Sequence, residues 1–275
     1  MGHNIITIAN PKGGVSKTTT TGHLSMAIAR KKSVLAVDFD QQKDLSKMFF
    51  FGETDNFFEM ANIFTLLKYE TTLSETIRNK YNVDIIVSAP SLQNFQSYAS
   101  KNIEVITRTK EILRESNHDF VIIDTPGSGS FETTSALLAA DIVIIPVIPH
   151  RWSLDTLKVF FKNINETMKQ TTSTLTSIFI LPSIWGNSNR SEQIYKDLYS
   201  IPEFLDLLKH QEDGFDLLPK PEILEPIFQS NTVRDRSEFG EPLAEGTQGK
   251  ISYDNLADKL ISFCSQKQPI TFSRH

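Results

Sequence analysis

The chain has 275 residues, with 28 Lys and Arg against 33 Asp and Glu, which gives a formal net charge of −5. Hydrophobic residues make up 39% and charged residues 22%, values typical of an ordinary globular protein. This composition excludes a wholly disordered chain. It also argues against a histone-like protein that coats nucleic acid through bulk positive charge, although it is compatible with a local basic patch.

The cysteine content and the hydrophobic segments indicate in which cellular compartment the protein functions. The single cysteine, Cys264, excludes an intrachain disulfide and a cysteine-rich zinc or iron–sulfur site within one chain. The N-terminal sequence lacks the basic start and apolar stretch of a signal peptide. Because no window approaches ~18 apolar residues, we expect no transmembrane helix and a cytoplasmic protein.

The pattern along the chain is one of short β-branched runs that alternate with longer amphipathic stretches, without a repeat of solenoid period. The near-continuous apolar runs indicate a parallel sheet that is buried on both faces. Alternation of strands and helices then predicts an α/β fold with a doubly wound, mainly parallel sheet and helices on both faces. Strands are predicted at residues 5–9, 33–37, 83–87, 120–123, 142–147 and 177–181, and helices at 18–31, 102–114, 130–140, 154–168 and 251–265.

Two segments have weaker patterns. Residues 49–76 are rich in aromatic side chains without a clear period and are predicted to be a helical insertion. Residues 211–225 contain Gly and Pro among mixed charges and are predicted to be a loop. No Gly/Ser-rich linker is present, so we expect a single domain over residues 1–275. It would comprise a motif-bearing core at 4–150, a C-terminal part at 151–266 and a short tail at 267–275.

The strongest motif follows the first predicted strand and opens the first helix, with the sequence N-P-K-G-G-V-S-K-T-T at residues 10–19. Gly13 and Gly14 allow backbone N–H groups to point into one concavity, and Lys17 adds positive charge toward a β- or γ-phosphate. The helix N-terminus favours an anion, and the Thr18 hydroxyl is placed to bind Mg²⁺. The common phosphate-loop pattern has glycine where this chain has Pro11 and Ser16. The alternative interpretation is a glycine-containing turn before a helix.

The K-G-G-x-x-K-[ST] arrangement resembles the deviant Walker A motif of the ParA/MinD superfamily of dimeric P-loop ATPases. In that family the additional lysine, here Lys12, reaches across a dimer interface to the partner's nucleotide. Ser16 stands where the family more often has glycine. The resemblance implies that ATP is bound by Lys12, Gly13, Gly14, Val15, Ser16, Lys17, Thr18 and Thr19.

Two carboxylates follow the second predicted strand. Alternation along the strand places Asp38 and Asp40 on the same side, at the carboxyl end where α/β proteins bind ligands. The segment resembles the family's D-x-D-P-Q motif, with Gln41 in place of the proline. The resemblance implies that Asp40 orients or activates the attacking water and that Asp38 lies nearer the Mg²⁺ shell. The alternative is that one carboxylate caps the following helix.

A third carboxylate, Asp124, ends the apolar run at residues 120–123 and resembles a Walker B aspartate that holds Mg²⁺ through water. Gly127 could present its N–H near the γ-phosphate. A strand that ends in Asp is common in α/β proteins, so the order of the three motifs carries the argument. Residues 144–147 and 152–155 also resemble the family, although core packing is our preferred interpretation of Trp152.

The second half of the chain distinguishes members of the superfamily. Nitrogenase-type iron proteins need two cysteines per subunit, and this chain has one. MinD-type proteins end in a basic amphipathic helix that lies on the membrane, whereas residues 263–269 are short, nearly uncharged and end in proline. The remaining main class is ParA, whose members segregate plasmids or chromosomes. We therefore expect no membrane binding.

By resemblance to ParA proteins, the ATP-bound dimer binds DNA nonspecifically, and a ParB-type centromere-binding partner stimulates slow ATP hydrolysis. Phosphate contacts require basic side chains on one surface, for which Arg190, Arg234 and Arg236 are candidates. The alternative is a solvated surface of mixed charge, because acidic residues lie nearby. The first predicted strand starts at residue 5, so we expect no N-terminal helix-turn-helix extension and no operator-specific binding.

The expected function is thus that of a cytoplasmic, nucleoid-associated ATPase that requires Mg²⁺ and drives DNA segregation. Two alternatives stay open. One is a related ATPase that positions a protein cargo, and the other is a nucleotide-dependent regulator that does not hydrolyse ATP.

Overall fold

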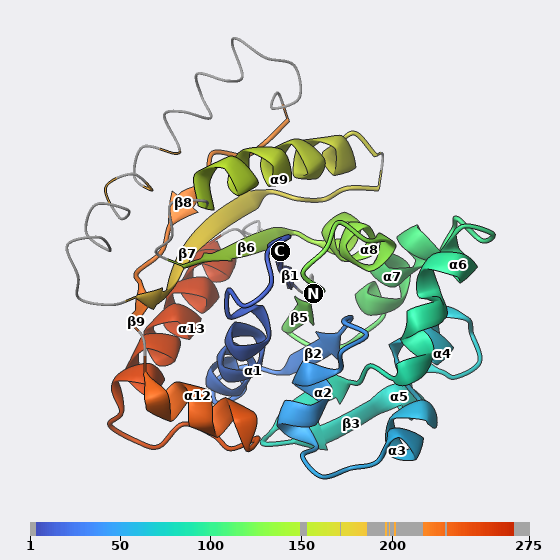
Figure 1. Ribbon diagram of the computed structural model, residues 1–275, viewed down its shortest axis with the longest axis horizontal. Coiled ribbons are helices and arrows are strands. Elements are labelled where there is room, and N and C mark those ends of the chain that lie inside the picture. Colours follow the sequence, from blue (N-terminus) through green and yellow to red (C-terminus); the bar gives the residue numbers. More distant parts are fainter. Residues whose placement is uncertain are drawn as a thin grey trace, which may run out of the picture.

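The computed structural model describes residues 4–148, 153–170, 172–185, 196, 198, 201, 217–228 and 230–266. In these residues one sheet has the strand order β3-β4-β2-β5-β1-β6-β7-β8, and β9 pairs with β7 (Figure 1). Neighbouring strands are parallel, except for the antiparallel pair of β3 and β4. The strands are β1 (Asn4–Ile8), β2 (Val34–Asp38), β3 (Ile77–Lys80), β4 (Val83–Ile86), β5 (Phe120–Asp124), β6 (Ile142–Val147), β7 (Ser177–Trp185), β8 (Glu222–Ile223) and β9 (Ile227–Phe228).

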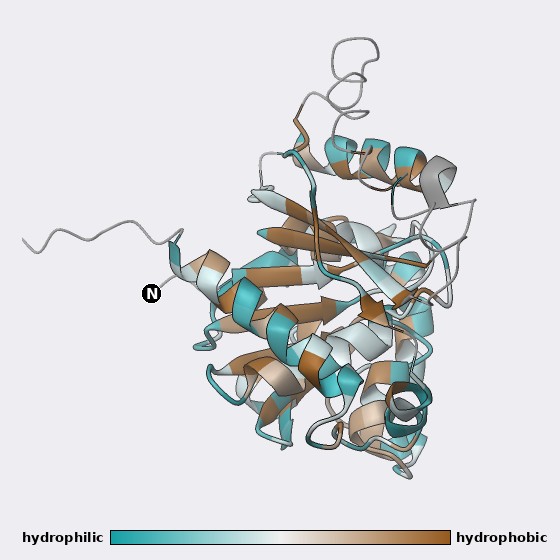
Figure 2. Cartoon of the chain, turned by 90° about the vertical axis from the view of Figure 1, so that its left-hand side faces the viewer, coloured by the Kyte–Doolittle hydropathy of each residue, from teal (hydrophilic) through white to brown (hydrophobic). Residues whose placement is uncertain are grey.

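Helices cover both faces of the sheet, and the strands between them are strongly apolar (Figure 2). Alternate side chains of a strand enter different cores, since Ile6 packs with helices on one face and Ile5 with helices on the other. The first face carries α1 (Lys17–Ile28), α2 (Asp44–Phe49), α12 (Asn231–Glu238) and α13 (Gln248–Gln266). The second carries α4 (Ile63–Leu67), α6 (Phe95–Ala99), α7 (Val105–Arg114), α8 (Phe131–Ala139) and α9 (Ser153–Met168).

The doubly wound, mainly parallel sheet predicted from the sequence is confirmed. The six predicted strands and five predicted helices are present, with small shifts of their ends. The helical insertion at 49–76 is confirmed as well, since it contains α3 (Asp55–Glu59), α4 and α5 (Leu73–Thr76). No helix in the described part of the chain combines the length and apolar character needed to cross a membrane.

Three short strands were not predicted. The edge strand β3 has the sequence IRNK, which is too short and polar to show a strand pattern. The loop prediction for residues 211–225 was wrong at Glu222–Ile223, which forms β8 by pairing with β7. Residues 211–216 of that segment lie outside the described residues. Strand β9 likewise depends on a distant partner, because a two-residue strand has no periodicity of its own.

The register of the three central strands places the sequence motifs side by side. Ile8, the last residue of β1, is paired with Asp124 at the end of β5. Asp38, at the end of β2, is paired with the same Asp124. The loop after β1 and the carboxylates that end β2 and β5 therefore meet at the carboxyl edge of the sheet, as expected for a ligand site in this fold class.

Candidate functional site

The loop between β1 and α1 is folded back on itself by side-chain and backbone contacts. The Asn10 amide donates to the Pro146 carbonyl at 2.8 Å, and its Oδ1 accepts the Lys12 N–H at 2.9 Å. Gly14 and Ser16 both have left-handed backbones, with φ of 71° and 70°. Ser16 is strained there because a Cβ atom disfavours this conformation.

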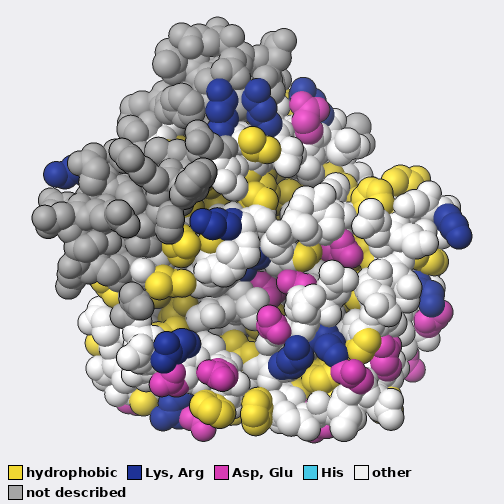
Figure 3. All heavy atoms as spheres, viewed as in Figure 1, with side chains coloured by type: hydrophobic (Ala, Val, Ile, Leu, Met, Phe, Trp, Pro, Cys, Tyr) yellow, Lys and Arg dark blue, Asp and Glu magenta, His cyan; other side chains and the backbone are white. Residues whose placement is uncertain are grey.

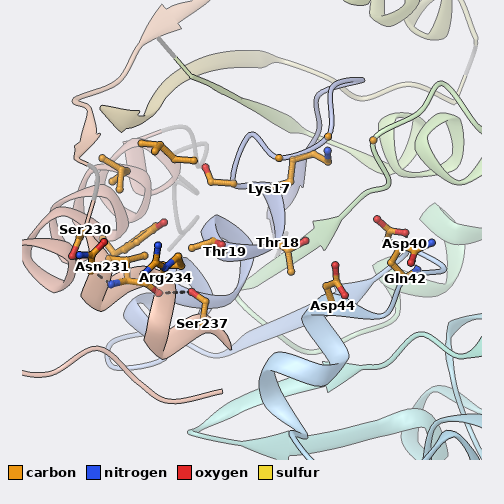
Figure 4. A pocket seen from close by; sticks show the side chains of 18 of the residues that line it. Lys17, Thr18, Thr19, Asp40, Gln42, Asp44, Ser230, Asn231, Arg234 and Ser237 are labelled. Atoms are coloured by element: carbon orange, nitrogen blue, oxygen red, sulfur yellow. Dashed lines mark hydrogen bonds between the residues drawn. The ribbon is translucent and has the colours of Figure 1, made fainter. Parts of the chain in front are cut away.

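Lys17 lies across this loop (Figure 4). It is the first residue of α1, it is buried, and its Nζ donates to the Lys12 carbonyl at 3.0 Å. Burial lowers the pKa of Lys17, while Asp124 and Asp40 oppose that change. The loop therefore holds one desolvated cation next to the free N–H groups of the α1 N-terminus, an arrangement suited to an anion.

Thr18 and Asp124 are brought together as the sequence predicted. The Thr18 hydroxyl donates to Asp124 Oδ2 at 2.7 Å, and the Thr21 hydroxyl lies 3.3 Å from Oδ1. Asp124 is fully buried, and burial together with nearby Asp38 raises the pKa of its carboxyl. A buried carboxylate next to a second one is stabilised by a cation, so this cluster has the oxygen donors that Mg²⁺ prefers.

Asp38 makes the contacts of a helix cap. Its Oδ2 accepts the N–H of Ser46 at 2.8 Å and the Ser46 hydroxyl at 2.6 Å, in the first turn of α2. Its Oδ1 accepts the Asp40 N–H at 3.1 Å. Burial raises the pKa of Asp38 to about 7. The helix-capping alternative is therefore what the structure shows for this carboxylate, which holds both α2 and the backbone of Asp40.

Asp40 is half-buried and faces the same cavity as Lys17 and Thr18 (Figure 4). Its Oδ1 accepts the Gln42 N–H at 2.9 Å, and burial raises the pKa of its carboxyl. The second carboxylate oxygen has no hydrogen bond to the described residues. Asp40 is thus an oriented carboxylate at the cavity wall, with one oxygen available to a ligand or to water.

Gly127 lies against the phosphate loop. A Cβ atom at this position would be 3.2 Å from both the N and the Cα atoms of Gly13. This distance is shorter than ordinary van der Waals contact, and the neighbour is backbone, so a side chain would displace the loop. Glycine here allows the segment after β5 to approach the loop after β1.

The cavity has a volume of about 550 Å³ and extends beyond the motifs. Its phosphate-loop end is polar, and Figure 3 shows acidic side chains near the middle of this face. Its other end is formed by α12, α13, β9 and Ile184 of β7. In Figure 4 Asn231 and Arg234 of α12 lie on the far side of Lys17 from Asp40. The sequence analysis missed this end, whose apolar lining consists of Ile184, Ile227, Phe228, Val233 and Tyr253.

The basic residues predicted to contact DNA have mixed surroundings. Arg234 lines the same cavity, is 71% exposed and donates to the adjacent Asp235 at 3.2 Å. Arg236 forms an ion pair with Glu241. Both arginines therefore lie on α12 beside acidic groups. This arrangement favours the alternative interpretation, a solvated surface of mixed charge. Arg190 and Trp152 lie outside the described residues.

Comparison with known proteins agrees with this arrangement. A family model described as an AAA domain matches residues 3–177. A ParA family protein of Chlamydia muridarum is 30% identical over 204 residues, which cover 70% of this chain and 76% of that protein. The sporulation initiation inhibitor protein Soj of Bacillus subtilis is 31% identical over 170 residues, or 60% of this chain and 66% of Soj.

Among solved structures, a putative plasmid partition protein of Borrelia burgdorferi bound to AMPPNP has a TM-score of 0.75 at 23% identity. It covers 95% of this chain and 99% of its own. The likeness confirms the fold. The matched domain and the Chlamydia relative show the family of this chain, in agreement with the phosphate loop and the carboxylates that follow β2 and β5. This chain therefore belongs to the ParA family, within the ParA/MinD superfamily of P-loop ATPases.

Proposed function

We propose that this chain binds ATP in the 550 Å³ cavity and hydrolyses it to ADP and phosphate, as a ParA-type ATPase that moves DNA. The observation that carries the proposal is that one cavity is lined by three features. These are a phosphate loop with a buried lysine, a carboxylate available to water, and an apolar wall at the opposite end.

ATP would lie along the cavity. The loop N–H groups and Lys17 bind its phosphates, and the helix N-terminus adds a favourable dipole. The apolar side chains at the other end, including Phe228 and Tyr253, provide a surface for the base. A desolvated lysine attracts a phosphate more strongly than an exposed one, because the local dielectric constant is lower.

Thr18 and Asp124 would hold Mg²⁺, with Asp38 in support behind them. When bound, the ion would neutralise phosphate charge that develops during hydrolysis. The fit follows from Asp124 itself, because a buried carboxylate with a raised pKa gains stability from a neighbouring cation. The Asp38 contacts to Ser46 and Asp40 indicate that it orients this part of the site rather than facing the cavity.

Asp40 would orient the attacking water with its available oxygen and accept the water's proton as the bond to phosphorus forms. Its raised pKa makes it a stronger base than an exposed aspartate. The position of Asp40 is fixed by two hydrogen bonds: its Oδ1 accepts the Gln42 N–H, and its own N–H donates to Asp38. Lys12 would complete the site of a second subunit in an ATP-bound homodimer.

Arg234 and Arg236, with Arg190, would contact DNA phosphates in that dimer on the nucleoid, and a ParB-type partner would stimulate hydrolysis. Two findings support this DNA-binding role. The chain belongs to the ParA family, and α12 both lines the cavity and carries Arg234 and Arg236 at the surface. Because phosphate contacts release counterions, DNA binding should weaken steeply with salt.

The test is size measurement with ADP and with a slowly hydrolysed ATP analogue, with and without nonspecific DNA, together with ATP turnover. A dimer that forms with the analogue and binds DNA supports the proposal. Arg234→Ala with Arg236→Ala should weaken DNA binding and reduce its salt dependence, while Lys31→Ala with Lys32→Ala removes the same charge elsewhere and should not. Turnover without any response to DNA and a centromere-binding protein would favour cargo positioning, and absence of turnover would favour the regulator.

A further inference from the structure

A buried histidine connects the phosphate-loop helix to the far end of the cavity. His23 in α1 is 2% exposed, and its Nε2 lies 2.9 Å from the Ser237 hydroxyl of α12. That hydroxyl donates its own hydrogen to the Val233 carbonyl at 2.7 Å. Ser237 must therefore accept from His23, so Nε2 of the imidazole carries the hydrogen.

The histidine is neutral at ordinary pH, because burial lowers its pKa to about 4. Its ring packs against Tyr253 of α13, with ring centroids 5.4 Å apart. Tyr253, Val233 and Ser237 all line the cavity, whereas His23 lies behind them. His23 thus contacts cavity-lining residues on two helices without touching the cavity itself.

The position of His23 along α1 gives this contact a consequence for ligand binding. Lys17 is at the start of α1, and His23 lies about 9 Å further along the helix axis. The hydrogen bond to Ser237 therefore ties α12 to the same helix that carries the phosphate-binding lysine. Val233 also packs against Gly249 of α13, and α13 is joined to the end of α1 by ion pairs of Arg30 with Asp254 and of Lys31 with Asp258. The hydrogen bond of His23 adds a direct contact between α1 and α12.

We propose that His23 is a positioning residue that fixes the distance between the phosphate loop and the opposite wall of the cavity, so that one nucleotide contacts both ends. The inference rests on the proposed ATP site and adds a determinant of its selectivity. A ligand that spans the cavity depends on the link between His23 and Ser237. A ligand that uses the phosphate loop alone does not depend on it.

The experiment compares binding of ATP and of inorganic triphosphate to the full chain by calorimetry in the presence of Mg²⁺. For His23→Ala and for Ser237→Ala, we expect the Kd of ATP to rise about tenfold and the Kd of triphosphate to stay within about twofold of wild type. His23→Gln can place a donor N–H near the position of Nε2 and should restore most of the ATP affinity. Ser25→Ala removes a buried hydroxyl of α1 that has no hydrogen-bond partner among the described residues; it is the matched control and should leave both affinities unchanged.

Equal weakening of ATP and triphosphate would overturn the inference, since it would mean that His23 acts on the phosphate loop itself. Unchanged ATP binding in both His23→Ala and Ser237→Ala would also overturn it. If His23→Ala fails to fold, Ser237→Ala makes the same comparison of ATP with triphosphate, and His23→Gln should bind both ligands nearly as wild type does. Failure of the proposed function has a different signature, because wild-type protein would then bind neither ligand.

Discussion

Acidification should destabilise the fold through His23, and the pH dependence of stability tests its buried, neutral state. In the folded chain burial lowers the pKa of His23 from 6.5 to about 4. Between these two pH values the unfolded chain binds a proton at His23 that the folded chain does not. The free energy of unfolding therefore rises with pH in this window, and the contribution of His23 is lost as the pH falls from 6.5 to about 4.

The magnitude follows from the size of this difference in pKa. Each pH unit corresponds to about 1.4 kcal/mol, so the full contribution is about 3 kcal/mol. This is a large part of the 5–15 kcal/mol that roughly spans the stability of natural domains. Asp38 acts in the opposite direction, because burial raises its pKa to about 7 and the folded chain keeps a proton that the unfolded chain releases. Its contribution is lost as the pH rises toward 7.

Comparison of wild type with His23→Gln separates the two effects, because Asp38 is present in both proteins. Urea unfolding of each protein, followed by circular dichroism from pH 7.5 down to pH 4.5, gives the difference in the free energy of unfolding at each pH. We expect wild type to lose about 2 to 3 kcal/mol relative to His23→Gln over this range. Parallel pH profiles for the two proteins would refute a neutral, buried His23.

Three further predictions concern the cavity. Ser16→Gly should raise the free energy of unfolding by about 1 kcal/mol in urea titrations, because Ser16 has a φ of 70° that glycine adopts without strain; lower stability would contradict this. Gly127→Ala should weaken ATP binding about tenfold by displacing Gly13. Gly129→Ala, whose added Cβ has no atom of the described residues within 4 Å, should bind ATP normally, and equal affinities of the two variants would disprove the close approach. Asp40→Ala should still bind ATP but lower turnover by about 100-fold or more, and near-normal turnover would assign the water to another group.

The parallel sheet and its helices could be predicted because apolar runs and amphipathic stretches are local signals. The edge strand β3 and the two-residue strands β8 and β9 could not, since their pairing depends on partners elsewhere in the chain. The helical character of residues 49–76 was predictable, whereas the division into α3, α4 and α5 was not. That division depends on local caps such as the Asn62 side chain, which accepts the N–H groups of Phe64 and Thr65.

The candidate site was predicted where its residues follow strands in short motifs. Lys17, Thr18, Asp40 and Asp124 converge because parallel strands end at one edge. The opposite wall of the cavity was missed, because Phe228, Val233 and Tyr253 belong to no recognisable sequence motif. Only the folded chain brings them into the cavity that the phosphate loop lines. The two readings of Asp38 could not be separated from sequence, because its helix-capping contact with Ser46 depends on where α2 begins.

The most direct test of the account is equilibrium binding of ATP to Lys17→Ala, with Lys47→Ala as the control. Lys47 is an exposed lysine on α2 that pairs with Asp44, so its removal changes the net charge equally without touching the phosphate loop. We expect Lys17→Ala to lose measurable ATP binding and Lys47→Ala to bind as wild type does. Normal ATP affinity in a folded Lys17→Ala protein would contradict the assignment of this cavity as the nucleotide site.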